Sequence, residues 1–412
     1  MPSKLSQFLG SFNCFRQKPQ PTLVTSIPYE VESKGLRVSS RSIHSNDQAP
    51  TSTSTESTLH APPLQIEVQQ DSKSKSNSAL VVVGKGQYEL RESFPFPSLD
   101  HEREVVIRTK AVGLNPIDWK SVDYGFCLPE FPWITGREMA GVVEHVGSEV
   151  TEFHVGQRVW TSTYYKDRRA GCFQHFVTVP QHTVAPIPAG LSFEEASCLG
   201  VAGLTAAMTL WRWLQVPGSP RTETHSIPST GYILIWGGST VTAQFAIQLA
   251  VLGGLKVIAV TSSKTKALAE ALGASRVVTR DGKSGDEIVA EIRLFCGDAI
   301  TRAIDLVGPE TAKHCLQALS RSQKSLFAPL AMLSSKAVVP QNISVETVEM
   351  KQFVLDPSSQ AYSRALNKLV EEGRIMLPHI EVLDGGLDII QHGLERIKKG
   401  DMAGKKVIVR MH

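Results

Sequence analysis

A glycine-rich turn between an apolar strand and an apolar helix is the clearest sign of chemistry in this chain. Residues 232–243 read YILIWGGSTVTA, in which two glycines end the strand and the helix starts near Ala243. Glycines let the backbone approach a pyrophosphate, and the free N–H groups of a helix N-terminus hold that anion. We therefore expect a dinucleotide to be bound by Gly237, Gly238, Ser239, Thr240 and Val241. A plain strand–helix turn is the alternative, because serine replaces the second glycine of the usual G-x-G-x-x-G pattern.

The end of the next apolar strand indicates which dinucleotide is bound. Residues 257–264 read VIAVTSSK and contain no Asp or Glu. An acidic residue at this tip would bind the ribose 2′-hydroxyl of NAD and repel a 2′-phosphate. Ser262, Ser263 and Lys264 instead offer hydroxyl donors and a cation, which favours NADPH. In the alternative interpretation, Lys264 is an ordinary solvated residue at the start of the following helix.

Two kinds of pattern surround these segments. From residue 79 to about 205, short runs of alternating apolar residues are divided by Gly and Pro, which is typical of a β-rich lobe. From Tyr232 strands and helices alternate, which predicts βαβ units and a parallel sheet. Mixed elements return after about residue 345, and the chain ends in a strand-like segment, 405–410. We predict an α/β protein that combines both parts.

The first 78 residues differ in composition from the rest. Residues 47–78 are rich in Ser, Thr, Pro, Gln and Lys, so they cannot bury enough apolar surface to offset the entropy of ordering. Residues 1–46 are basic and Ser-rich, and RSIHS at 41–45 resembles a presequence processing region. We expect residues 1–78 to form a disordered extension of a cytoplasmic protein. The alternative is a transit peptide that sends the chain to the mitochondrial matrix.

The overall composition excludes several classes of protein. The 412 residues include 43 Lys+Arg and 40 Asp+Glu, and a net charge of +3 is too small to predict nucleic acid or an anionic membrane as the main partner. No run of 18 apolar residues is present, so we predict no membrane span. The six cysteines form no C-x-x-C pair, which favours reduced thiols over a disulfide framework.

Short motifs along residues 79–412 resemble the medium-chain dehydrogenase/reductase superfamily. They are GLNPID (113–118), GREMAG (136–141), GCFQHF (171–176), AGLTA (202–206), GGST (237–240), AIQLA (246–250), LGA (272–274) and AIDL (303–306). Within the superfamily, NPIDWK (115–120), IWGGST (235–240) and the segment 398–410 resemble fungal NADPH-dependent trans-acting enoyl reductases, which are related to quinone oxidoreductases. The resemblance implies a GroES-like domain made of residues 79–205 and 346–412, with a Rossmann domain inserted at 206–345.

Zinc is not expected despite this resemblance. Zinc-using relatives place a Cys near the first motif and a His in a Gly-His-Glu motif, where this chain has Asn115 and Arg137. Neither residue can replace a thiolate or a neutral imidazole as a ligand. The structural zinc lobe needs four closely spaced cysteines, and segment 156–180 contains only Cys172. We predict no metal at either place.

Reduction of an activated C=C bond suits a zinc-free enzyme of this kind. The cofactor gives a hydride to the β-carbon, and the protein must stabilise charge on the conjugated carbonyl oxygen and supply a proton. Lys120 is our candidate for that proton, with Asp118 orienting it. Thr205 matches a threonine that the family places beside the nicotinamide. A solvated surface lysine is the alternative for Lys120.

The leading hypothesis is therefore an NADPH-dependent oxidoreductase that reduces an enoyl or enone substrate, as a trans-acting enoyl reductase of a fungal polyketide pathway does. The substrate would be a small molecule or an enoyl chain on a carrier protein, and a polyketide synthase would be the partner. One alternative is a quinone or enone reductase of general metabolism. Another is a non-catalytic NADPH-binding protein that interacts with other macromolecules. The sequence leaves the substrate and the oligomeric state open.

Overall fold

The computed structural model describes residues 76–218, 220, 231–400 and 402–412. Almost all of the expected extension, residues 1–78, lies outside the described residues, so its disorder and targeting stay predictions. Strand β1 (Asn77–Gly84) begins two residues before the expected start of the fold. Among the described helices, none is long and apolar enough to cross a membrane.

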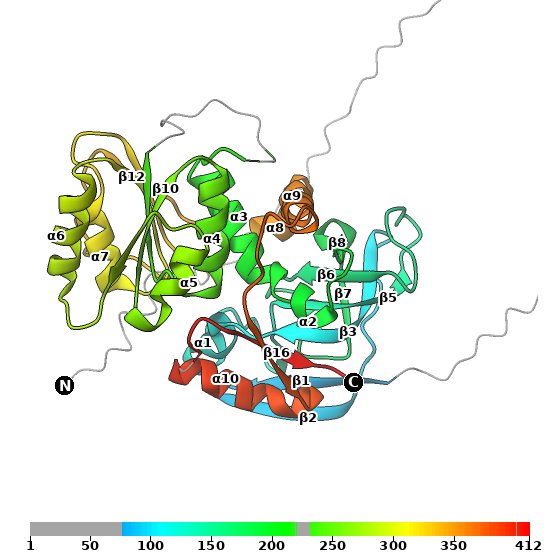
Figure 1. The fold of residues 1–412 in the computed structure, drawn as a ribbon. Coiled ribbons are helices and arrows are strands. Elements are labelled where there is room, and N and C mark those ends of the chain that lie inside the picture. The colour runs from blue at the N-terminus through cyan, green and yellow to red at the C-terminus, as the bar shows by residue number, and fades with distance from the viewer. Residues whose placement is uncertain (1–75, 219, 221–230, 401) are drawn as a thin grey trace, which may run out of the picture. The chain divides into compact units, whose positions relative to one another are not determined.

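The β-rich lobe is built from both ends of the described chain. Strand β3 (Glu104–Gly113) lies at its centre and pairs with β5, β7 and β16. The order across the larger sheet is β15 (Ile380–Asp384), β16 (Lys406–Arg410), β3, β5 (Glu138–Val146), β6 (Arg158–Ser162) and β8 (Val184–Pro186), with β7 (Phe176–Pro180) also on β3. A smaller sheet contains β2 (Gln87–Phe94), β1 and β4 (Trp133–Ile134). The C-terminal strands thus complete a sheet that the N-terminal part begins (Figure 1).

The second lobe is a six-stranded parallel sheet. Its order is β11 (Arg276–Thr279), β10 (Lys256–Thr261), β9 (Tyr232–Trp236), β12 (Ile300–Asp305), β13 (Ser325–Pro329) and β14 (Ile343–Val345). The chain order reverses direction between β9 and β12, which is where α/β sheets of this kind bind ligands. The parallel sheet beside a β-rich lobe confirms the predicted α/β fold class.

Helices cover both faces of the parallel sheet because its central strands are apolar on both faces. In β9, Ile233 and Ile235 face the core under α4 (Val241–Leu252) and α5 (Lys266–Ala271). Leu234 and Trp236 face the opposite core, under α6 (Gly285–Cys296) and α7 (Pro309–Ala318). Figure 1 shows these two pairs of helices on opposite sides of the sheet.

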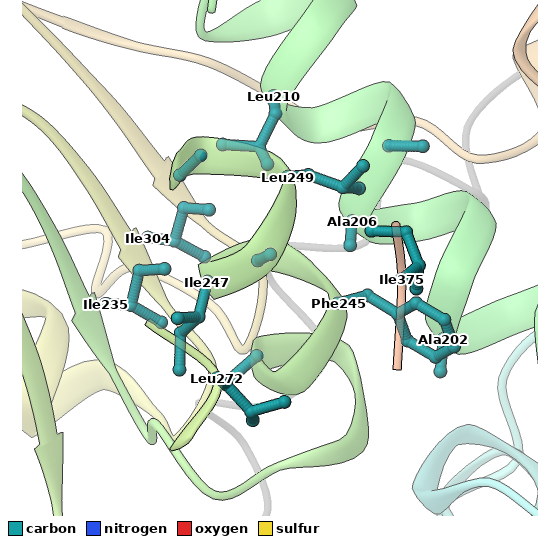
Figure 2. Packing of buried hydrophobic residues seen from close by; sticks show 14 of the residues in the cluster. Ala202, Ala206, Leu210, Ile235, Phe245, Ile247, Leu249, Leu272, Ile304 and Ile375 are labelled. Carbon is teal, nitrogen blue, oxygen red and sulfur yellow. The ribbon is translucent and has the colours of Figure 1, made fainter. Parts of the chain in front are cut away.

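The helical segment 199–213, which presents small residues, packs on α4. Helix α3 (Leu204–Met208) is flanked by the π-helical turns Leu199–Gly203 and Thr209–Trp213. Figure 2 shows Ala202, Ala206 and Leu210 of this segment beside Phe245 and Leu249 of α4. The small alanines let the two helices approach closely. The expected boundary at 205/206 lies inside this continuous helical segment, and the boundaries stay predictions.

The remaining helices complete the two lobes and connect them. They are α1 (Pro116–Tyr124), α2 (Phe193–Ala196), α8 (Gln352–Leu355), α9 (Gln360–Glu371) and α10 (Ile390–Lys399). Helix α9 joins β6 of the β-rich lobe through a buried hydrogen bond of 2.9 Å from Trp160 Nε1 to Asn367 Oδ1. The C-terminal segment reaches α4, since Gln244 Nε2 donates to the Gly404 carbonyl at 2.6 Å.

Candidate active site

The glycine turn lies at the carboxyl edge of the parallel sheet, directly after β9. The N–H groups of Gly237 and Gly238 both donate to the Val260 carbonyl of β10, at 3.1 and 2.9 Å. Gly237 has a φ of +91°, and a Cβ there would lie 2.9 Å from Val307 Cγ2. A Cβ on Gly238 would lie 3.0 Å from the Ala259 Cβ. The two glycines are therefore needed to hold the turn tightly against the adjoining strands.

The turn leads into the N-terminus of α4. Thr240 is the N-cap, and its Oγ1 accepts from the Ala243 N–H at 3.2 Å. The N–H groups of Val241 and Thr242 have no acceptor within the helix, because they belong to its first turn. Together with the positive end of the helix dipole, they suit an anionic group. Residues Gly237–Val241 thus form one tight turn before α4. Their contacts with a cofactor phosphate stay predictions.

The side chains at the tip of β10 form hydrogen bonds with one another that the sequence did not predict. Thr265 Oγ1 lies 2.6 Å from Thr261 Oγ1 and 3.0 Å from Ser262 Oγ, so the Ser262 hydroxyl already has a partner in the turn. Of the three predicted residues, Ser263 and Lys264 have exposed side chains, but the Ser263 N–H is already bonded to Asp281.

Two residues that directly follow the neighbouring strand β11, Arg280 and Asp281, also lie at this tip, and the sequence analysis missed them. The Arg280 N–H donates to the Thr261 carbonyl at 2.9 Å, and the Ser263 N–H donates to Asp281 Oδ2 at 2.5 Å. The second strand and its tip contain no acid, as the sequence shows, but the parallel pairing places Asp281 beside that tip. The signal was available, because parallel strands bring their carboxyl ends to one edge of a sheet.

Asp118 has a structural task at the start of α1. Its Oδ2 accepts from the Asn115 N–H at 2.8 Å, and Pro116 occupies the first helical position. The side chain is fully buried, and Oδ1 has no hydrogen-bond partner among the described residues. Burial raises the pKa of Asp118 to about 7, while the nearby Arg137 guanidinium lowers it. Burial therefore favours the protonated form of this carboxyl at pH values where an exposed aspartate is ionised.

Lys120 lies two residues further along α1 and is half-buried. Its Nζ lies 5.7 Å from the centroid of the Trp119 ring, and burial lowers its pKa. Helical residues at i and i+2 point in different directions, and no hydrogen bond or ion pair joins Lys120 to Asp118 in the described chain. The structure therefore gives no support to the expected orientation of Lys120 by Asp118, which stays a prediction. A proton-donor role for Lys120 alone stays a prediction.

A buried network occupies the place where zinc-using relatives need ligands. Lys406 Nζ donates to Glu138 Oε1 and, at 2.8 Å, to Asn115 Oδ1. Asn115 Nδ2 donates to the same Glu138 oxygen at 2.8 Å, and the Val201 N–H donates to Oε2. The Glu138 carboxylate is thus satisfied by protein groups and is not open to a metal.

The side chains beside this network do not fit a metal either. Arg137 is half-buried, with Nε and Nη2 buried and without partners in the described chain, and its Cζ lies 5.3 Å from the Tyr165 ring centroid. Burial raises the pKa of the neighbouring Cys172 thiol, which favours its neutral form. Within the described ranges, no group of three or more His, Cys, Asp or Glu side chains could hold a metal ion. A guanidinium beside a protonated thiol is unsuitable for Zn²⁺.

Two further residues complete the description of the candidate site. Thr205 is half-buried in α3, the helix that packs on α4, and its contact with a nicotinamide stays a prediction. Asp305 ends β12 beneath the glycine turn and accepts from Thr311 Oγ1 at 2.6 Å and from the Gly308 N–H at 3.0 Å. Burial raises the pKa of Asp305 to about 6. Its hydrogen bonds fix the β12 exit against which Gly237 packs.

Comparison with known proteins agrees with this architecture. Residues 101–189 match the alcohol dehydrogenase GroES-like domain, and residues 242–371 match the zinc-binding dehydrogenase family. The trans-enoyl reductase himH of Aspergillus japonicus is 33% identical over 315 residues, which cover 74% of this chain and 89% of that protein. A trans-enoyl reductase of Gibberella fujikuroi is 30% identical over 368 residues, covering 81% and 98%. The quinone oxidoreductase of Pseudomonas syringae shares the fold, with a TM-score of 0.66 and 23% identity over 81% of this chain and 99% of its own.

Proposed function

This chain belongs to the medium-chain dehydrogenase/reductase superfamily of oxidoreductases, and on that basis we propose that it reduces an activated carbon–carbon double bond with NADPH. One observation carries the proposal: the dinucleotide turn at Gly237–Val241 is complete, while Asn115, Arg137 and Glu138 cannot hold a catalytic metal. The names of the trans-enoyl reductase relatives support the same reaction type.

Specific groups of the chain would serve this reaction. When bound, the nicotinamide cofactor supplies a hydride to the β-carbon of an enoyl or enone acceptor. The protein then has to stabilise negative charge on the acceptor's carbonyl oxygen and deliver a proton to the α-carbon. Lys120 suits the proton transfer, since its lowered pKa makes the ammonium a better acid than an ordinary lysine. The turn and the first-turn amides of α4 would hold the pyrophosphate.

The cofactor and the partner are part of the same proposal. Exposed Lys264 and Arg280 supply positive charge at the tip of β10, which supports NADPH over NADH. The relatives named as trans-enoyl reductases support an acyl chain presented by the carrier protein of a polyketide synthase. In that arrangement the enoyl group would lie in the site at the carboxyl edge of the parallel sheet, and the carrier protein would stay outside it.

Single-turnover NADPH oxidation by the full chain tests this function. We expect oxidation with an enoyl thioester, and a higher kcat/KM for the carrier-bound thioester than for a free quinone. A preference for free quinones would instead favour a quinone reductase of general metabolism. Tight NADPH binding without oxidation by thioesters, enones or quinones would contradict the proposal and favour a non-catalytic NADPH-binding protein.

A further inference from the structure

The Asp281 carboxylate accepts a hydrogen bond from a backbone amide at the carboxyl edge of the parallel sheet. Strands β10 and β11 pair in parallel with Thr261 opposite Thr279, so the residues that follow β11 lie beside the tip of β10. There Asp281 Oδ2 accepts from the Ser263 N–H at 2.5 Å. This hydrogen bond lowers the pKa of Asp281, which therefore carries a full negative charge at neutral pH.

The charges around this contact are mixed. Lys264 and Arg280 are both exposed, and neither forms an ion pair with another described residue. Lys283 is nearby but already bonds to Glu291 at 2.5 Å. A 2′-phosphate would be attracted by Lys264 and Arg280 and repelled by Asp281, and the Arg280 charge also acts on the Asp281 carboxylate.

We propose that Asp281 limits the preference for NADPH, because its bond to the Ser263 N–H fixes a negative carboxylate at the tip of β10, beside the position expected for a 2′-phosphate. Carboxylate and phosphate oxygens carry like charge and repel each other at short distance. A ribose 2′-hydroxyl has no such conflict, since it can donate to the Asp281 carboxylate. The usual acid for that contact follows the second strand itself, whereas here it arrives from the neighbouring strand.

This inference rests on the proposed function, since it assumes that a dinucleotide lies across this edge. The test therefore uses two fragments that are never turned over, 2′,5′-ADP and 5′-AMP, which differ at the 2′-phosphate. Their affinities for the full chain are measured by calorimetry in the natural protein and in Asp281→Asn. Asp286→Asn is the matched control, because Asp286 is an exposed acid in the following helix α6.

We expect D281N to bind 2′,5′-ADP about fivefold to tenfold more tightly, which is about 1–1.4 kcal/mol, and to bind 5′-AMP within about twofold of the natural chain. The gain should shrink at high salt, because both groups are exposed. D286N should change neither affinity beyond about twofold. Arg280→Gln should weaken 2′,5′-ADP binding by about tenfold without affecting 5′-AMP.

The outcomes separate this inference from the proposed function. If the natural chain binds both fragments and D281N gains nothing for 2′,5′-ADP, the inference is overturned and the proposed function stands. Weaker binding of 2′,5′-ADP by D281N would mean that Asp281 braces the Ser263 turn, which also overturns it. If the natural chain binds neither fragment, the dinucleotide site itself is contradicted.

Discussion

Lys120 and Asp118 lie two residues apart in α1, and the helix gives them different environments. Asp118 is buried and accepts from the Asn115 N–H, whereas Lys120 is half-buried near the Trp119 ring. An aspartate that completes a helix N-terminus is needed for folding whether or not it takes part in catalysis. Replacing Lys120 therefore tests the proposed proton transfer. Replacing Asp118 tests how a buried carboxyl affects the stability of the fold.

Lys120→Ala should lower kcat by about 10²-fold or more, since a positioned proton donor contributes about 10²–10⁴-fold. NADPH affinity should stay unchanged. In the natural chain the protonated Lys120 amine is the active form, and burial lowers its pKa. The turnover rate of the natural chain should therefore fall as the pH rises, with a midpoint below the pKa of an ordinary lysine. Lys398→Ala is the matched control, because Lys398 also lies over the Trp119 ring, at 5.5 Å. Turnover of K120A within about threefold of the natural rate would exclude the role.

Asp118→Asn should change how stability depends on pH. The folded pKa of Asp118 is about 7, against about 4 for an unfolded aspartate. Between these values the folded chain holds a proton that the unfolded chain has lost, so this group's contribution to stability falls as the pH rises. Asparagine cannot titrate, and it keeps an oxygen acceptor for the Asn115 N–H.

The unfolding free energy of D118N relative to the natural chain should therefore increase with pH, by at most about 1.4 kcal/mol per pH unit between roughly pH 4 and pH 7. Urea unfolding at several pH values measures this difference. Asp388→Asn, at an exposed side chain before α10, should show no such trend. A constant difference for D118N would show that the folded and unfolded chains bind the same proton at every pH, so that the pKa of Asp118 is not raised by burial.

At the scale of elements, the strand β9, its glycine turn and α4 act as one unit. Gly237→Ala places a Cβ at a φ of +91° and 2.9 Å from Val307 Cγ2. We expect a loss of about 2–4 kcal/mol in unfolding free energy and weaker nucleotide binding, because backbone strain and overpacking add. Calorimetric titration with 5′-AMP and urea unfolding measure the two effects.

Gly282→Ala separates the strain from the packing. Gly282 also has a positive φ, +71°, but a Cβ there would have no neighbour within 4 Å. Its replacement should cost only about 1 kcal/mol, which is the backbone contribution alone. Equal losses in G237A and G282A would show that the contact with Val307 relaxes freely and that the turn tolerates a side chain.

At the scale of the whole molecule, the Lys406–Glu138–Asn115 network closes the β-rich lobe. Lys406 begins the C-terminal strand β16, Glu138 begins β5, and Asn115 precedes α1, so one buried cluster joins segments 291 and 268 residues from Lys406. Figure 1 shows β16 returning beside β3 after the chain has passed through the parallel sheet.

Lys406→Met should destabilise the protein by about 3–5 kcal/mol, because it leaves the Glu138 carboxylate buried and unpaired. Adding Glu138→Gln should recover part of that loss. The exposed pair Arg364–Glu152 is the comparison, and Arg364→Met should cost less than about 1 kcal/mol. Similar losses for K406M and R364M in urea unfolding would contradict a special role for the buried network.

Several features were predictable because they depend on residues close together in sequence. The alternation of strands and helices from Tyr232 predicted the parallel sheet, and the GGST turn predicted where a dinucleotide would lie. Hydrophobic periodicity and turn chemistry act over a few residues, so they are readable along the chain. Asn115 and Arg137 argued against zinc by their chemical type, once the resemblance had indicated where zinc-using relatives place their ligands.

Other features were decided by tertiary structure alone. The helix at α1 separated Asp118 from Lys120, the parallel pairing of β10 and β11 put Asp281 on the Ser263 amide, and the return of β16 put Lys406 on Glu138. These contacts depend on strand order and register, which follow from burial of the whole core and not from local pattern. The sequence by itself determined the fold class and the dinucleotide turn. The packing of distant strands decided which charges face the site, because charges act through space and not along the chain.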